Sequence, residues 1–182
     1  MKNIVIVFVV IGVLAFVYML IFDNGTSSPS TSNVPSATTS SNSAPVVIKE
    51  QPRQNLIRAF LAKELELDNE LQRGNDEVAN AGREFDYGVP LPYIIKAELI
   101  FEKVLEEGKA LVAPPGAENV KTYLVEATSY ALSGVKKTRE GLESYPVDKT
   151  KLGQGIELYT KSQMPLARKN AEIDKLKQEA GI

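Results

Sequence analysis

The residues best suited to chemistry in this chain are glutamates at helical spacing. Glu98, Glu102 and Glu106 follow one another at intervals of four, so a helix places their carboxylates along one face. Pairs of helices that present such carboxylates can bind two metal ions, but they combine each glutamate with a Glu-x-x-His motif. The chain contains no histidine, which excludes a di-iron site of that kind, and it has no Asp-x-Asp-x-Asp-Gly calcium loop. A solvated face with salt bridges to Lys103 and Lys109 is therefore the favoured interpretation.

Glu64 is a second candidate, because it occupies a position where the apolar pattern calls for a hydrophobic residue. The run Ile57, Phe60, Glu64, Leu67 advances in steps of three and four. A buried carboxylate there could donate a proton or fix the helix register with a basic partner. The favoured interpretation is more ordinary, namely a side chain at the end of a core that extends to water.

The residue types missing from the chain restrict its chemistry further. Cys, His and Trp are all absent, which removes disulfides, most transition-metal sites and the Ser-His and Cys-His catalytic pairs. A glycan hydrolase needs only two acidic residues, but no pair here stands out for that task. We expect no catalytic, cofactor-binding or metal-binding residue, no cofactor, and no enzymatic activity.

Tyrosines and glycines are the remaining candidates for a binding surface or a groove. Exposed tyrosines can form a surface that binds sugar or protein, although packing at the boundary of the core is the favoured explanation. The tyrosines concerned are Tyr87, Tyr93, Tyr123, Tyr130, Tyr145 and Tyr159. Gly74, Gly108 and Gly134 interrupt helical stretches, and each would let neighbouring helices approach closely.

The region that must position these side chains, residues 49–182, is predicted to be an all-α domain, an antiparallel bundle of about four helices. Apolar residues recur there at intervals of three and four, the period of an amphipathic helix. Pro52 suits the start of the first helix and residues 88–90 (GVP) its end, while Pro92 suits the start of the second. Residues 113–116 (APPG) form a turn before the third. Short turns between long helices make neighbouring helices antiparallel.

The last part of the domain is harder to divide. Tyr145-Pro146 ends the third helix, and Asp148 can cap a fourth. Pro165 then either kinks the fourth helix or opens a fifth. A stack of helical hairpins is the alternative to the bundle, but the chain has no internal repeat of a known period. The expected core positions are Ile57, Phe60, Glu64, Leu67, Leu71, Gly74, Val78, Ala81, Phe85, Ile94, Ala97, Phe101, Val104, Leu105, Leu111, Val120, Tyr123, Leu124, Ala127, Ala131, Val135, Leu142, Leu152, Ile156, Tyr159, Leu166, Ile173 and Leu176.

The first residues of the chain predict a membrane anchor. Residues 4–22 (IVIVFVVIGVLAFVYMLIF) carry no charge, and as a helix they span roughly 28 Å, close to the ~30 Å apolar core of a bilayer. Lys2 and the amino terminus precede this segment and Asp23 follows it, so we expect the amino terminus inside and the long remainder outside the cytoplasm. Residues 1–23 are therefore predicted to be a single-pass signal anchor in the cell membrane. The alternative is a cleaved secretory signal and a secreted protein, but the apolar core is longer than such signals require.

Residues 24–48 are predicted to be a disordered linker. In residues 24–45 twelve of twenty-two residues are Ser or Thr, three are Pro, and none is charged. Such a segment cannot bury enough apolar area to offset the entropy of ordering. Asn24-Gly25-Thr26 is a glycosylation sequon, but a plain spacer is the favoured interpretation.

The function that follows is a tethered, non-enzymatic module. After position 45 the chain carries 20 basic and 22 acidic residues, which are the totals of 21 and 23 less Lys2 and Asp23. The charges are interspersed, so we expect no nucleic-acid partner. We expect two partners: the membrane itself, bound through the N-terminal helix, and a protein or an envelope polymer. One form of this function is that of a subunit in a larger membrane complex. The alternatives are an extracytoplasmic small-ligand binder or sensor and, less favoured, a hydrolase that uses carboxylates alone.

Overall fold

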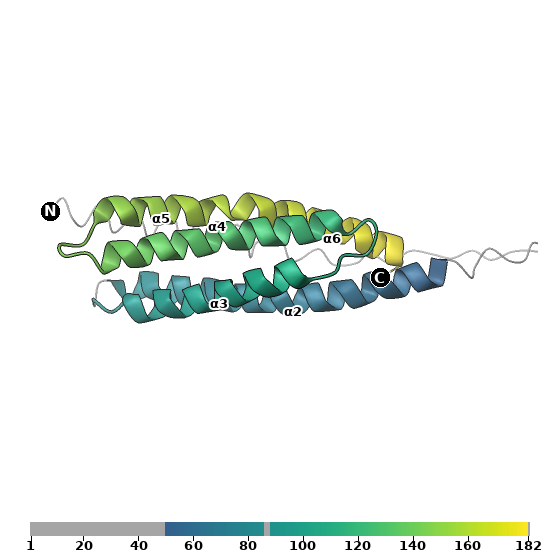
Figure 1. Ribbon diagram of the computed structural model, residues 1–182, viewed down its shortest axis with the longest axis horizontal. Coiled ribbons are helices and arrows are strands. Elements are labelled where there is room, and N and C mark those ends of the chain that lie inside the picture. Colours follow the sequence, from purple (N-terminus) through teal and green to yellow (C-terminus); the bar gives the residue numbers. More distant parts are fainter. Residues whose placement is uncertain (1–49, 86–87, 182) are drawn as a thin grey trace, which may run out of the picture. The chain divides into compact units, whose positions relative to one another are not determined.

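The computed structural model describes residues 50–85 and 88–181, and within these residues the secondary structure is entirely helical (Figure 1). The predicted anchor and linker lie outside the described residues. The helices are α2 (Glu50–Arg83), α3 (Leu91–Ala110), α4 (Glu118–Leu142), α5 (Lys149–Lys161) and α6 (Gln163–Ala180). The predicted all-helical bundle is confirmed for this part of the chain.

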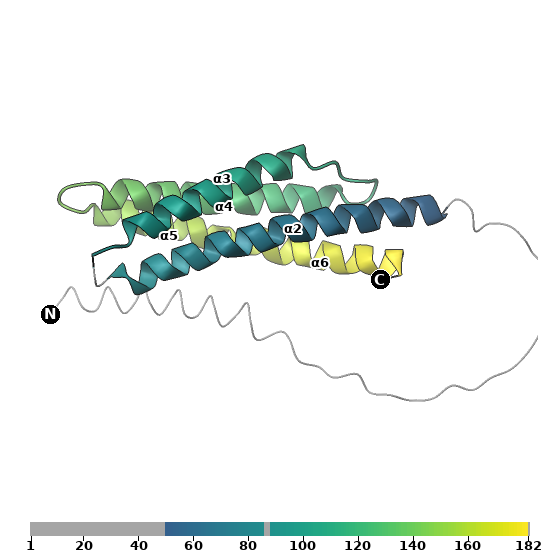
Figure 2. The same cartoon turned by 90° about the horizontal axis from the view of Figure 1, so that it is seen from below.

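The five described helices form a bundle of four rods. Helices α5 and α6 follow each other almost in line and together make one rod (Figure 1). Each rod runs opposite to its neighbour in the chain. The loops that join α2 to α3 and α4 to α5 lie at one end of the bundle (Figure 1). The beginning of α2 and the end of α6 lie side by side at the other end in both views (Figure 2). The first and last described helices are therefore neighbours without a short connecting loop.

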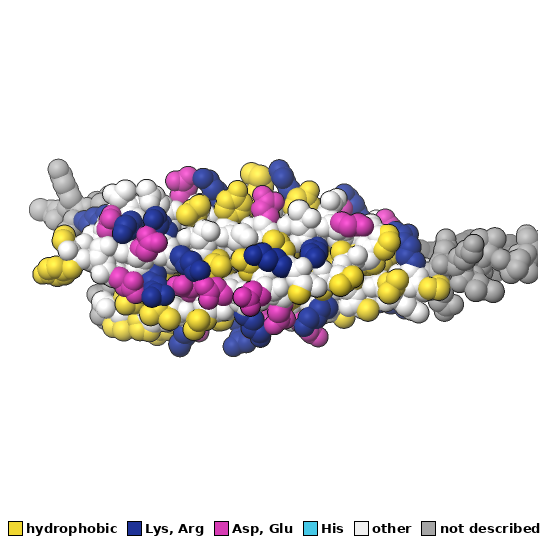
Figure 3. Space-filling model, in the orientation of Figure 1, with side chains coloured by type: hydrophobic (Ala, Val, Ile, Leu, Met, Phe, Trp, Pro, Cys, Tyr) yellow, Lys and Arg dark blue, Asp and Glu magenta, His cyan; other side chains and the backbone are white. Residues whose placement is uncertain are grey.

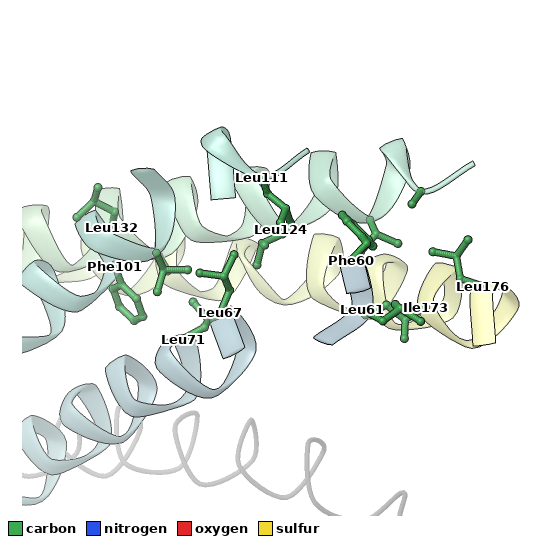
Figure 4. Close-up of a cluster of buried hydrophobic side chains, with 14 of the residues drawn as sticks. Phe60, Leu61, Leu67, Leu71, Phe101, Leu111, Leu124, Leu132, Ile173 and Leu176 are labelled. Atoms are coloured by element: carbon green, nitrogen blue, oxygen red, sulfur yellow. The ribbon is translucent and has the colours of Figure 1, made fainter. Parts of the chain in front are cut away.

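The core is the apolar stripe that the sequence predicts. Ile57, Leu67, Phe101 and Leu124 are at most 2 % exposed, and side chains from α2, α3, α4 and α6 meet in the interior (Figure 4). One expected core residue is wrong, since Phe85 is 41 % exposed. It lies beyond the end of α2 at Arg83, where the chain has left the helix and its core-facing period.

The helix ends confirm two sequence signals. The Asp148 carboxylate accepts hydrogen bonds from the backbone N–H groups of Thr150 and Lys151 at 2.9 and 3.1 Å, which is the expected cap of α5. The rod α5–α6 is interrupted at Ser162, three residues before Pro165. Pro165 has no N–H to bond the carbonyl one turn earlier, and Ser162 keeps helical angles of φ −64° and ψ −22°. The last rod is thus divided into two helices, α5 and α6, so that the chain forms the fifth helix that was one of the two alternatives.

Two of the three predicted glycine contacts are close. A Cβ at Gly74 would lie 2.3 Å from Cε1 of Phe101, and one at Gly134 would lie 2.8 Å from the carbonyl oxygen of Gly155. The first glycine accommodates an aromatic ring of α3, and the second lets the backbones of α4 and α5 touch. Gly108 has only ordinary contacts, at 3.6 Å or more, so its position does not require a glycine.

Candidate functional site

The most unusual group of side chains is a buried ion cluster between α2 and α6. The Lys169 Nζ atom of α6 donates to Oε1 of Glu64 at 2.6 Å and also to Oδ1 of Asp68. Glu64 and Asp68 are four residues apart on α2, so their carboxylates lie one above the other on the face that meets α6. One ammonium therefore bridges two carboxylates.

Burial decides the electrostatics of this ion cluster. Lys169 is 0 % and Glu64 is 3 % exposed, whereas the Asp68 side chain is 34 % exposed and reaches solvent. Burial raises the pKa of the Glu64 carboxyl, and the negative charge of Asp68 adds to this, while Lys169 acts in the opposite direction. The prediction that Glu64 extends to water is wrong, because the carboxylate is enclosed and held by a basic partner.

An open groove runs beside the ion cluster between α2 and α6. It encloses about 680 Å³ and combines apolar side chains with acidic and basic ones. Its lining residues are Leu61, Ala62, Glu64, Leu65, Asp68, Asn170, Ile173, Asp174 and Lys177. Figure 4 shows Leu61 of α2 and Ile173 of α6 meeting at its base. The groove can accept an apolar group beside a carboxylate.

Further polar contacts extend along the same side of α2. Near one end, the Tyr159 hydroxyl donates to Oδ1 of Asn75 at 2.8 Å, and burial raises the pKa of Tyr159 above its usual value of 10, with the charge of Asp76 adding to the effect. At the other end Arg53 pairs with Glu179 at 3.0 Å. Polar bonds thus connect α2 to the last rod at several levels along its length.

The three glutamates of α3 do not form a site. Glu98 pairs with Arg139 at 3.2 Å and Glu102 with Lys136 at 2.7 Å, while Glu106 is exposed. Acidic and basic side chains alternate over the face formed by α3 and α4 (Figure 3). The salt-bridged face is confirmed, but the partners of Glu98 and Glu102 come from α4 and not from the neighbouring lysines of α3. Within the described residues no three Asp or Glu side chains are placed to hold a metal ion.

The tyrosines divide between packing and exposure. Tyr93 packs against the core, and the ring centroids of Tyr159 and Phe101 are 6.4 Å apart. Boundary packing is wrong for Tyr145, which is fully exposed in the loop between α4 and α5. Tyr87 lies outside the described residues. Other large apolar side chains are more than half exposed, namely Leu56, Leu65, Leu99, Val112 and Met164.

Lys169 is the residue that the sequence pattern did not reveal. It lies between Leu166 and Ile173 at steps of three and four, so it occupies the apolar face of α6 as Glu64 occupies that of α2. Glu64 and Lys169 carry opposite charges, and each interrupts the apolar stripe of a different helix. This pattern is the sequence signal from which their pairing could have been predicted.

Comparison with known protein families, with curated proteins and with solved structures finds no match to this chain. Among the residues that the structure describes, no helix has the length and apolar character needed to cross a bilayer.

Proposed function

We propose that the chain is a membrane-tethered, non-enzymatic helical module, held outside the cytoplasm by residues 1–23 and bearing a surface for a protein or envelope-polymer partner. The tether rests on the uncharged segment 4–22, which has the length of a bilayer-spanning helix. The linker of residues 24–48 would let the bundle move away from the bilayer, with a reach of roughly 25–30 Å for a flexible chain of this length.

The observation that carries the proposal is the ion cluster, because it engages Glu64 and Asp68, two carboxylates that would otherwise be candidates for catalysis. A glycan hydrolase needs one carboxyl group to donate a proton and another to act as base or nucleophile. Glu64 and Asp68 both bind the same ammonium of Lys169, and Glu64 is enclosed in the core. Because the same ammonium binds both carboxylates, the pair does not offer one free proton donor and one free base or nucleophile, which supports a non-enzymatic role.

The bundle surface supports binding as the function. Leu65, Leu99, Val112, Tyr145 and Met164 are each at least 58 % exposed, and among residues of this kind an exposed tyrosine such as Tyr145 is a frequent anchor of protein contacts. Charges of both signs are interspersed over the face formed by α3 and α4 (Figure 3). A surface of that kind fits a protein partner better than a polyanion.

The test is crosslinking in native membranes with the anchor intact. A photoreactive amino acid would replace Leu65, Leu99 or Tyr145 in turn, and Lys149 as an exposed polar control. We expect a discrete crosslinked product from at least one apolar position and none from the control. Equal, diffuse crosslinking to abundant proteins from all four positions would contradict the proposal.

A second candidate function, small-ligand binding, is favoured by the groove between α2 and α6. Its apolar base at Leu61 and Ile173 and its carboxylate at Asp68 suit a small molecule with an apolar body and a cationic group. Thermal shift of the full-length chain against a set of aliphatic amines tests this candidate. A shift that Asp68→Asn abolishes would support it, whereas no shift with any amine would contradict it.

A further inference from the structure

We infer that α6 can move about the break at Ser162 while the rest of the bundle stays folded. The interface between α2 and α6, called the seam below, then opens as a unit. The contact of Lys169 with Glu64 and Asp68, called the latch, holds the seam closed. Four features carry this inference: the break in the last rod, the place of Lys169 relative to the break, the polar contacts within the seam, and the order of the helices in the chain.

The hinge is the break at Ser162. Because Pro165 lacks an N–H, the carbonyl one turn before it receives no helical hydrogen bond from that residue. That carbonyl belongs to Lys161. The Tyr159 carbonyl accepts from both the hydroxyl and the backbone N–H of Ser162, at 2.6 and 3.1 Å, and regular helical bonding resumes with the Leu166 N–H donating to the Ser162 carbonyl at 3.3 Å. Missing backbone bonds at a proline are where a helix bends most easily.

The latch lies one turn beyond Pro165. Lys169 follows Pro165 by four residues and carries the ammonium that binds Glu64 and Asp68 across the seam. A buried ammonium has lost its hydration, and only close contact with its partner carboxylates compensates for that loss. The contact is therefore favourable only while these short distances are kept. Opening the hinge returns all three groups to water together, so this contact behaves as one unit.

The seam also contains buried apolar side chains, among them Leu61, Ile173 and Leu176, and further polar contacts. At its far end it is closed by Arg53 with Glu179, and by the Arg58 guanidinium donating to the carbonyl of Ala180 at 3.3 Å. Both bonds involve exposed or partly exposed groups, which contribute little to stability. The open groove beside Leu61 and Ile173 shows that α2 and α6 are not packed tightly along their outer edge.

The other end of the last rod is fixed differently. There α5 is held to α4 by direct backbone approach, with Gly155 against the carbonyl of Gly134 and the side chain of Thr138. Motion at the hinge therefore separates α6 from α4 as well as from α2, and leaves α5 in place. Since α2 and α6 are the first and last described helices, no short loop holds them together when the seam opens.

Thiol labelling of the full-length chain in mild detergent tests the inference, because the chain has no cysteine of its own. Leu176→Cys, buried in α6 and not part of the groove lining, reports on the seam, and Val104→Cys, buried in α3, reports on the rest of the core. Under conditions where labelling follows the population of open molecules, we expect Leu176→Cys to react at least about tenfold faster than Val104→Cys. Its rate should also rise less steeply with urea, since less surface is exposed in a partial opening.

Two further substitutions separate a local opening from global unfolding. Asp68→Asn weakens the latch and should speed labelling at both cysteines by several-fold, because both openings break it. Val135→Ala lies in the part of α4 that faces α5, and should speed labelling at Val104→Cys alone, because this contact survives when the seam opens. Equal rates at the two cysteines in the parent, or equal acceleration of both by Val135→Ala, would overturn the inference.

Discussion

Replacing Gly74 with alanine should destabilise the bundle, although alanine is the better helix former. The added Cβ would lie 2.3, 2.8 and 2.9 Å from three carbons of the Phe101 ring, whereas carbon atoms in contact normally lie about 3.5–4.0 Å apart. Phe101 is 0 % exposed, so its ring has no free space to enter. Overpacking of this kind costs ~1–3 kcal/mol or more, and the helix propensity of alanine returns ~1 kcal/mol. We expect a net loss of up to about 2 kcal/mol in the free energy of unfolding.

Gly153→Ala is the matched control, because a Cβ at Gly153 in α5 would meet no atom within 4 Å. This change should stabilise the chain by up to ~1 kcal/mol. Urea unfolding of the full-length chain in detergent, followed by circular dichroism at a helical wavelength, measures both variants. In a Phe101→Leu background the smaller side chain should relieve the contact, so that Gly74→Ala becomes nearly neutral. If Gly74→Ala stabilised the chain as Gly153→Ala does, the close contact of α2 with α3 would be refuted.

Four other predictions follow from the same contacts. Lys169→Met should cost ~3–5 kcal/mol in urea unfolding, because it leaves Glu64 buried without a cation, whereas Lys169→Met with Glu64→Leu should restore most of that loss. The stability advantage of the parent over Glu64→Gln should be largest below about pH 4.5, the ordinary pKa of the group, and fall as pH rises through its raised pKa. The sign follows because the folded chain holds this proton more tightly than the unfolded chain. Asp148→Ala should cost ~0.5–2 kcal/mol through the lost cap of α5. Gly134→Ala should destabilise the chain more than Gly74→Ala, because its Cβ would meet the backbone of Gly155 and not only a side chain.

Each of these predictions has an opposing outcome, which for Gly134→Ala is a loss of stability no greater than that caused by Gly74→Ala. If Lys169→Met were as stable as the parent, its ammonium would not be the partner that Glu64 requires. A stability difference between the parent and Glu64→Gln that grew with rising pH would mean that Lys169 outweighs burial at that carboxyl. An unchanged midpoint for Asp148→Ala, matching Ser133→Ala as an exposed control, would argue against the cap.

The fold was largely predictable because its helices obey simple rules. Apolar residues at steps of three and four marked the core, and prolines and glycines marked most of the ends. The last turn of α2 was less predictable, since Phe85 continues the spacing after the helix has ended at Arg83. A spacing rule cannot tell whether the backbone is still helical at the last position that fits it.

The ion cluster was only half predictable. Glu64 was identified as a charge on an apolar face, but its partner comes from 105 residues later in the chain. Lys169 satisfies the same spacing rule on α6, and long side chains of this type usually extend to water. Whether the Lys169 side chain is buried or extends to water depends on how α2 and α6 meet in three dimensions. The same is true of Glu98 and Glu102, whose cations lie on α4 and not one turn away on α3.

The central claim is that a tether holds this bundle at a membrane and outside the cytoplasm, and cysteine accessibility in intact cells tests it most directly. One variant carries Val112→Cys, a position 86 % exposed in the bundle, and the other carries Asn3→Cys, before the apolar segment. With a thiol reagent that cannot cross a bilayer, we expect Val112→Cys to be labelled in intact cells and Asn3→Cys only after the membrane is permeabilised. Both should stay with the membrane after an alkaline wash. Labelling of Asn3→Cys alone in intact cells, or release of the whole chain by the wash, would contradict the account.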